Sequence, residues 1–320
     1  MISSDILRVG GRMWGHRSVL ALVREHGHPA DPRMIIRARA RELVANARAQ
    51  GWDGPPFDPR VLASLLGIRV QSDTLGDNHD ACIFPRGQQL EIIFNATRPS
   101  TRQNFSICHE IVHTLFPDGF EMIRNRYQRR SRFDPDRELE ILCDIGASEI
   151  LLPEIDFRSD VEANGFGLAA VARLRERYQA SREAVIRRML QFDDGASAAV
   201  FLENRLKPSE AAARRQLTLL PGRHEPSPKL RIAYSVASDR FRAFLPQHKS
   251  VPDASCVYRA LHSGLVETNR ERWDIAGLPT STVEAMALPP GDEPNDPARA
   301  VALLRPIRNA QTSSRVKRSN

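Results

Sequence analysis

Two histidines flank a glutamate in the run His109-Glu110-Ile111-Val112-His113. Residues four apart lie on one face of a helix, so the two imidazoles can bind a single metal ion. Glu110, next to His109, can then act as a general base on a water that the metal activates. This run is the H-E-x-x-H pattern of zinc hydrolases. It predicts metal-dependent hydrolysis, with His109 and His113 as ligands and Glu110 as the catalytic residue.

The flanking residues predict the helix that this geometry needs. Pro99-Ser100-Thr101 is a start signal, and Phe116-Pro117-Asp118-Gly119 is a stop signal. Apolar residues recur between the two signals at helical spacing, at Phe105, Ile107, Cys108, Ile111, Val112 and Leu115. The alternative is that both histidines are merely polar residues at the edge of this apolar stripe.

A catalytic zinc ion usually takes three protein ligands and keeps one position open. A second helix, predicted between Asp134-Pro135 and Pro153, offers Glu140 as the third ligand, with Glu149 as the competing carboxylate. Asp144, one turn after Glu140, would accept the ring N–H of a ligating histidine and fix its tautomer. The alternative is that Glu140 and Asp144 belong to an ordinary solvated face.

These spacings resemble known families. H-E-x-x-H followed by E-x-x-x-D is similar to the gluzincin class of metallopeptidases, in which the glutamate and the aspartate have these two roles. Residues 106–117 and 140–153 resemble the two signatures of the ImmA/IrrE family of bacterial metallo-endopeptidases, and residues 55–68 resemble its first helix and strand. The resemblance covers residues 33–192, and residues 229–262 are weakly similar to the sensor-like region of the IrrE branch. Asp144 departs from the asparagine of many relatives, although both side chains accept hydrogen bonds.

The expected fold is α+β: a zincin-like metallopeptidase domain with a small antiparallel sheet, a helix-turn-helix-like segment and a small C-terminal α/β domain that is GAF-like. The expected divisions follow the chain. They are an N-terminal extension (1–32), the metallopeptidase domain (33–158), the helix-turn-helix-like segment (159–192), a linker (193–228), the sensor-like domain (229–306) and a disordered basic tail (307–320).

Strands are predicted at residues 68–71, 81–84 and 90–95, the last two joined across Pro85-Arg86-Gly87. We expect strand 81–84 near a sheet edge beside the cleft, where an extended substrate can add by backbone pairing. His79 and Tyr127 are guesses for the donor to the oxyanion, since no residue is singled out for this role. The arginine-rich residues 118–133 are either a basic lip over the cleft or, as we favour, a solvated loop.

Residues 166–192 contain two helical patterns compatible with a helix-turn-helix. Arg182, Arg187 and Arg188 could contact phosphates there. Two packed helices serve structure more often than DNA binding, and contacts to phosphates and bases cannot be separated in a sequence. The net charge of +7 permits contact with nucleic acid but does not establish it.

Composition narrows the location of the protein. No run approaches the roughly eighteen apolar residues that a membrane span needs, and the N-terminus lacks a signal-peptide core, so we expect a cytoplasmic protein without a membrane partner. The four cysteines, Cys82, Cys108, Cys143 and Cys256, lack C-x-x-C spacing and indicate reduced thiols. Cys108 and Cys143 lie close in sequence to proposed ligands. They are either part of a redox-sensitive metal site or, as we favour, buried core residues.

The sequence therefore predicts a cytoplasmic zinc-dependent endopeptidase, although manganese or iron could also bind two imidazoles and a carboxylate. The resemblance implies that its substrate is a helix-turn-helix repressor of the XRE type, whose cleavage derepresses a stress-response or mobile-element operon. The alternative is a DNA-binding transcriptional regulator with a structural or vestigial metal site. Glu110 discriminates between them, because a structural site needs no general base.

Overall fold

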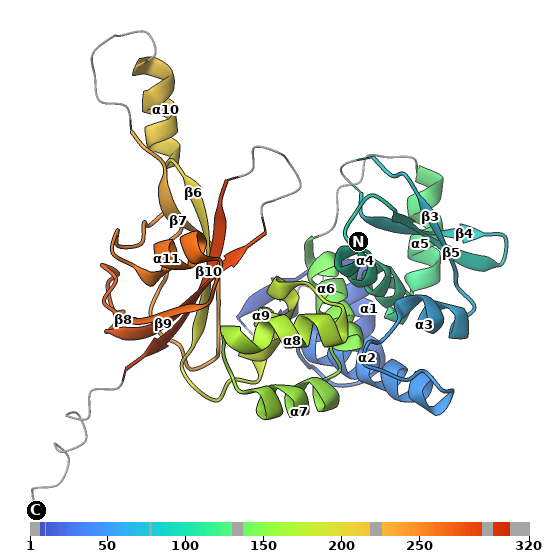
Figure 1. Ribbon diagram of the computed structural model, residues 1–320. Coiled ribbons are helices and arrows are strands. Elements are labelled where there is room, and N and C mark those ends of the chain that lie inside the picture. Colours follow the sequence, from blue (N-terminus) through green and yellow to red (C-terminus); the bar gives the residue numbers. More distant parts are fainter. Residues whose placement is uncertain are drawn as a thin grey trace, which may run out of the picture. The chain divides into compact units, whose positions relative to one another are not determined.

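The computed structural model (Figure 1) describes residues 7–9, 11–76, 79–129, 137–217, 226–289 and 297–307, apart from the side chains of 125–129 and 215–217. The chain divides into two compact units. The first comprises residues 1–160 and 173–185, and the second comprises 161–172 and 186–320. Both contain helices and strands, so the fold is α+β as predicted. The expected basic tail lies outside the described residues except for Ile307.

The first unit begins with a hairpin of β1 (Leu7–Val9) and β2 (Arg12–Trp14), then α1 (Arg17–His26), α2 (Pro32–Ala49) and α3 (Pro59–Leu65). Helices α2 and α3 start alike, since Asp31 and Asp58 each accept a backbone N–H just after a proline at the first helical position. Residues 14–16, within the expected N-terminal extension, contact the rest of this unit. Trp14 is fully buried, and Glu138 accepts the backbone N–H groups of Gly15 and His16.

A three-stranded sheet follows, made of β3 (Arg69–Asp73), β4 (Ala81–Arg86) and β5 (Gln89–Asn95) in the order β3-β5-β4. Strand β4 is antiparallel to β5, but β3 is parallel to it. The prediction of an antiparallel sheet is therefore wrong for the pair β3–β5. The β4–β5 hairpin leaves one side of β5 unpaired. Strand β3 pairs with that side of β5 rather than with β4, the next strand in the sequence. Strand β4 is an edge strand, as expected.

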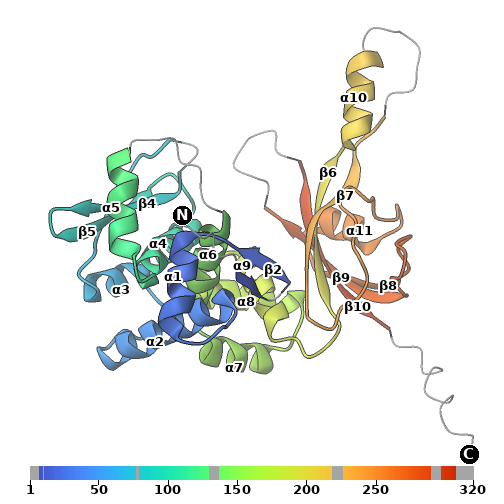
Figure 2. The same cartoon turned by 180° about the vertical axis from the view of Figure 1, so that it is seen from behind.

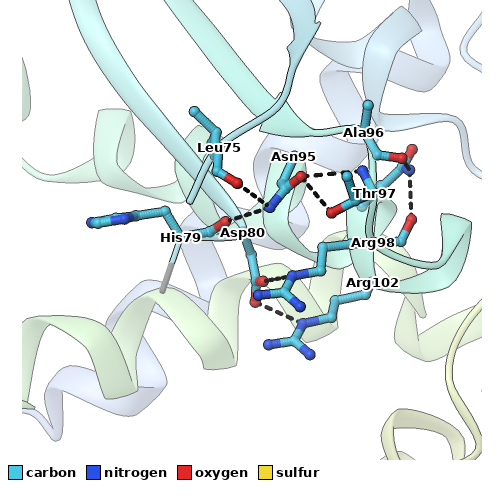
Figure 3. Close-up of polar contacts among 9 residues, drawn as sticks. Leu75, His79, Asp80, Asn95, Ala96, Thr97, Arg98 and Arg102 are labelled. Atoms are coloured by element: carbon cyan, nitrogen blue, oxygen red, sulfur yellow. Dashed lines mark hydrogen bonds and ion pairs between the residues drawn. The ribbon is translucent and has the colours of Figure 1, made fainter. Parts of the chain in front are cut away.

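The buried side chain of Asn95 anchors the loop that leads into β4 (Figure 3). Its amide donates to the carbonyls of Leu75 and His79, and its oxygen accepts from the backbone and hydroxyl of Thr97. Asp80, at the start of β4, bridges two arginines at the entry to the next helix, Arg98 and Arg102. The N-terminal end of the edge strand is thereby fixed to that helix.

The next four elements are α4 (Ser100–Val112), the 3-10 turn η1 (His113–Leu115), α5 (Gly119–Arg129) and α6 (Arg137–Leu151). The first helix and its stop are confirmed. The expected start of the second helix, Asp134-Pro135, lies outside the described residues. The loop expected at 118–133 is wrong over 119–129, where α5 forms and packs against β4. Helices α4 and α6 approach closely because Gly146 faces Val112, which leaves no room for a Cβ atom.

Helices α7 (Glu154–Asn164), α8 (Leu168–Tyr178) and α9 (Arg182–Gln191) complete the helical part. The two helical patterns expected within 166–192 are confirmed as α8 and α9. Ser181 caps α9 by accepting the N–H of Ala184, and Gln179 between the helices takes a left-handed φ of 48°. None of the described helices is both long and apolar enough to span a bilayer.

The second unit is built on a five-stranded antiparallel sheet in the order β7-β6-β10-β9-β8. Its elements are β6 (Ala198–Arg205), α10 (Pro208–Leu217), β7 (Lys229–Ala237), α11 (Cys256–Ser263), β8 (Glu267–Glu271), β9 (Ser281–Leu288) and β10 (Arg299–Pro306). Helix α11 packs against β8, β9 and β10 (Figure 2). Residues 193–228, expected as a linker, contain strand β6, because the apolar run 198–202 is wholly buried in the sheet.

Candidate metal centre

Helix α4 and the 3-10 turn η1 that directly follows it present the two histidines of the H-E-x-x-H run, His109 on α4 and His113 on η1. The ring centroids of His109 and His113 lie 5.2 Å apart, with the ring planes at 67°. The side chain of His109 is 15% exposed, whereas His113 is 1% exposed. The pair therefore sits at the boundary between core and solvent, where one imidazole is reached from outside and the other is held by packing.

Helix α6 supplies two carboxylates to His109. Nε2 of His109 lies 2.9 Å from Oε2 of Glu140, and Nδ1 lies 3.0 Å from Oδ1 of Asp144. Because Glu140 and Asp144 are four residues apart, they share the face of α6 that meets α4. Asp144 contacts Nδ1, where a hydrogen bond would fix the tautomer of the ring. Glu140 contacts Nε2, the nitrogen that would face a cation.

The charge around His109 favours a cation. Burial would lower the pKa of His109, but the hydrogen bonds to Asp144 and Glu140 and the charges of Glu110 and Glu140 outweigh it and raise the pKa to about 10. A field that keeps a proton on this buried imidazole also attracts a divalent cation. Imidazole and carboxylate donors suit zinc, manganese and iron. The donor types present thus fit a metal ion: the ligand atoms of His109, His113 and Cys143 lie within 4.8 Å of one another, and Glu140 lies at Nε2 of His109. His109, His113 and Glu140 stay the predicted ligands.

Glu149, the competing carboxylate, is engaged elsewhere. It is 1% exposed, and its carboxylate lies 3.2 Å from Nε of Arg41 and 3.9 Å from Nε of Arg37, both on α2. It also accepts the backbone N–H of Glu154 at the start of α7. These contacts give Glu149 a structural role between α6 and α2, so Glu140, at His109, is the carboxylate of the two that lies at the H-E-x-x-H run, and its role as third ligand stays a prediction.

His113 is braced by residues that the sequence pattern does not reveal. Sγ of Cys143 lies 3.5 Å from Nδ1 of His113, and the ligand atoms of His109, His113 and Cys143 lie within 4.8 Å of one another. A Cβ atom on Gly119 would lie 2.3 Å from the carbonyl oxygen of His113, so only glycine permits this turn. The spacing of the predicted ligands along the sequence does not indicate that Cys143 or Gly119 contacts His113.

Glu110 contacts the edge strand. Its Oε2 accepts the backbone N–H of Ile83 at 3.1 Å. Asp80 pairs with Asn95 across the sheet, so alternate residues of β4, namely 81, 83 and 85, direct their backbone groups away from β5. Pro85 has no N–H to offer at that edge. The candidate general base therefore lies beside the edge of β4 that does not pair with β5.

The thiol of Cys82, on the same strand, is affected by the charge of Glu110. Burial, and then the negative charge of Glu110, raise the pKa of Cys82 to about 11. This thiol therefore stays protonated near neutral pH. The guessed oxyanion donors gain no support. The His79 ring points away from the Asn95 network in Figure 3, and the side chain of Tyr127 lies outside the described residues.

The three arginines proposed for nucleic-acid contact do not form one exposed set. Arg188 is 1% exposed and donates to Gln191, which corrects its assignment to phosphate contact. Its guanidinium is turned into the fold because it packs over the ring of Phe192. Arg182 is half-buried, and Arg187 is exposed but lies over the ring of Tyr234. A phosphate-binding role for Arg182 and Arg187 stays a prediction.

Two helices that bring H-E-x-x-H against E-x-x-x-D, beside an edge strand, resemble the arrangement of a metallopeptidase site. Comparison with known families agrees: residues 63–190 match the IrrE N-terminal-like domain. This part of the chain thus resembles the IrrE N-terminal-like domain, and a metalloprotease of that kind holds a metal ion.

The relatives are distant and cover part of the chain. The radiation response metalloprotease IrrE of Deinococcus radiodurans is 26% identical over 158 residues, which are 49% of this chain and 46% of the relative. That of Deinococcus deserti is 28% identical over 129 residues, 39% of this chain and 44% of the relative. The matches span less than half of either relative.

A solved structure shares the fold. A transcriptional regulator of Mycobacterium tuberculosis aligns with a TM-score of 0.54 and 14% identity, over 90% of this chain and 80% of that one.

Proposed function

We propose that this protein is a zinc-dependent endopeptidase whose centre is formed by His109, His113 and Glu140, with Glu110 as general base. One observation carries the proposal: His109 lies between Glu140 and Asp144, with Glu140 at Nε2 and Asp144 at Nδ1. An accidental H-E-x-x-H run has no reason to meet a second helix at both ring nitrogens. The proposal is further supported by the match of residues 63–190 to a metalloprotease family.

The residues divide the work of hydrolysis. When bound, a divalent cation supplies Lewis-acid chemistry, polarising a carbonyl and making a water molecule more acidic. The carboxylate of Glu110 accepts a proton from the attacking water and delivers it to the leaving amine. Asp144 would accept the Nδ1–H of His109, which would leave Nε2 as the nitrogen that holds the cation.

The edge of β4 supports a polypeptide substrate. Ala81 directs its N–H and its carbonyl outward, and Ile83 directs its carbonyl outward beside Glu110. An extended segment of substrate can add to such an edge by backbone hydrogen bonds. The edge cannot donate at Pro85, so pairing in that direction is limited to the carbonyl.

The proposed substrate is a helix-turn-helix repressor of the XRE type, whose cleavage derepresses a stress-response or mobile-element operon. This part rests on the resemblance of the two signatures and on the relatives, which are named as radiation response metalloproteases. The rival function, a DNA-binding regulator with a vestigial metal site, loses support because Arg188 is buried.

The test incubates the purified protein with the repressor encoded beside its gene and follows cleavage by mass spectrometry. We expect Glu110→Gln to retain zinc and to lose cleavage, because only the base is removed. Glu140→Ala should lose zinc, whereas Glu149→Gln on the same helix should keep it. Undiminished cleavage by Glu110→Gln would overturn the mechanism, and full zinc content in Glu140→Ala would overturn the ligand assignment.

A further inference from the structure

Two consecutive residues of α6 contact the two histidines in the same way. Oδ1 of Asp144 lies 3.0 Å from Nδ1 of His109, and Sγ of Cys143 lies 3.5 Å from Nδ1 of His113. The second contact is wholly internal, because Cys143 is 0% exposed and His113 is 1% exposed. The family resemblance gives a role to Asp144 and none to Cys143.

The two contacts solve the same chemical problem. An imidazole that binds a cation through Nε2 must be neutral and must carry its proton on Nδ1. That N–H, when buried, needs an acceptor, and the acceptor then sets both the tautomer and the orientation of the ring. A carboxylate does this for His109 at the solvent boundary. A sulfur atom can do it for His113 in the core, as a weaker acceptor at a longer distance.

We propose that Cys143 is a positioning residue for His113: its sulfur accepts the Nδ1–H and holds the Nε2 lone pair towards the cation. The inference rests on the proposed function, because it assigns Cys143 to the metal centre of that peptidase. It differs from two other roles for a buried cysteine. A core cysteine would leave the metal affinity unchanged, and a cysteine ligand would bind the cation through sulfur.

The chain contains a matched control in Cys108. It is also 0% exposed and adjoins His109 on α4, so its removal deletes the same atom from the same core. The charges that act on its thiol are those of Asp58 and Arg60, on the side of α3. Replacement of Cys108 by alanine therefore reports the cost of the cavity without loss of a contact to His113.

The experiment compares the full-length wild type with Cys143→Ala, Cys143→Ser and Cys108→Ala. Zinc affinity is measured by competition with a chelator, and thermal unfolding of the metal-free proteins is measured beside it. We expect Cys143→Ala to bind zinc about 10- to 100-fold more weakly, the usual effect of losing such a partner. Cys143→Ser should recover most of the loss, because a hydroxyl accepts the same hydrogen bond. Cys108→Ala should bind zinc like the wild type.

Three results would overturn the proposal. Wild-type affinity in Cys143→Ala would show that the contact does not position His113. Equal losses in Cys143→Ala and Cys108→Ala would show a packing effect. A sulfur-to-cobalt charge-transfer band in the wild type loaded with Co²⁺, absent from Cys143→Ala, would make the sulfur a ligand. Failure of the wild type to bind zinc would remove the proposed function as well. The first two results leave that function standing, and the third would change its ligand set. If Cys143→Ala does not fold, the zinc affinities of Cys143→Ser and Cys108→Ser are compared instead.

Discussion

The crossing of α4 and α6 should respond strongly to a single methyl group at Gly146. A Cβ atom there would lie 2.7 Å from both γ-methyl groups of Val112 and 3.3 Å from its Cβ. Val112 cannot turn aside easily, because a β-branched residue in a helix has one strongly preferred rotamer and its side chain is fully buried. The variant Gly146→Ala must therefore separate the two helices.

Two opposing contributions set the magnitude. Overpacking a dense core costs about 1–3 kcal/mol, and replacing glycine by alanine inside a helix stabilises by about 1 kcal/mol. The net result is a loss of about 1 kcal/mol. In Gly146→Ala with Val112→Ala the clash disappears, so the double variant should be more stable than the sum of the single changes predicts, by about 1–3 kcal/mol.

The assay is amide hydrogen exchange in α4 and α6, which reports opening of this crossing separately from the second unit. Zinc affinity is measured on the same variants, because separation of the helices moves Glu140 away from His109. We expect Gly146→Ala to weaken zinc binding and the double variant to restore part of it. Additive effects of the two substitutions on exchange would refute the close contact, and unchanged zinc affinity would refute its role in the site.

Three further predictions concern single residues. Gly119→Ala should lower zinc affinity by displacing the backbone of His113, since its Cβ would lie 2.3 Å from the His113 carbonyl oxygen; wild-type zinc titration would contradict this. Asn95→Ala removes four side-chain hydrogen bonds and should destabilise the first unit by about 2–4 kcal/mol, with faster hydrogen exchange in β4. Glu271 is a buried carboxylate whose pKa burial would raise, but hydrogen bonds from Cys256 N–H, Trp273 and Ser255 outweigh this and lower it. A lowered pKa means that the stabilisation is present above the unfolded value of about 4.5 and is lost as the pH falls through the folded value. Glu271→Gln should therefore cost about 2 kcal/mol at neutral pH and nothing in strong acid, as checked by urea unfolding across pH.

Sequence reasoning reaches the parts of the site that depend on helix geometry. The i, i+4 spacings of His109 with His113 and of Glu140 with Asp144 place each pair on one helix face whatever the rest of the fold does. These features were predictable because the residues that cause them are neighbours along the chain.

The parts that sequence reasoning missed depend on contacts between distant segments. The parallel pairing of β3 with β5 is decided by which side of β5 remains available, and no strand pattern contains that choice. The role of residues 198–202 as a central strand was hidden by the alanine- and arginine-rich residues around them. Arg188 lies in a helix with other arginines, and only its position against Phe192 shows that it faces inward.

Helix geometry distinguishes Glu140 from Glu149, although the sequence offers both as the third ligand. The two residues are nine positions apart, about two and a half turns, so they point to opposite sides of α6. One side carries Glu140 to His109 on α4. The other side meets α2, where arginines four residues apart, Arg37 and Arg41, neutralise Glu149. Since no rotation of α6 brings both carboxylates to α4, the side of α6 that faces His109 decides which glutamate can meet a cation.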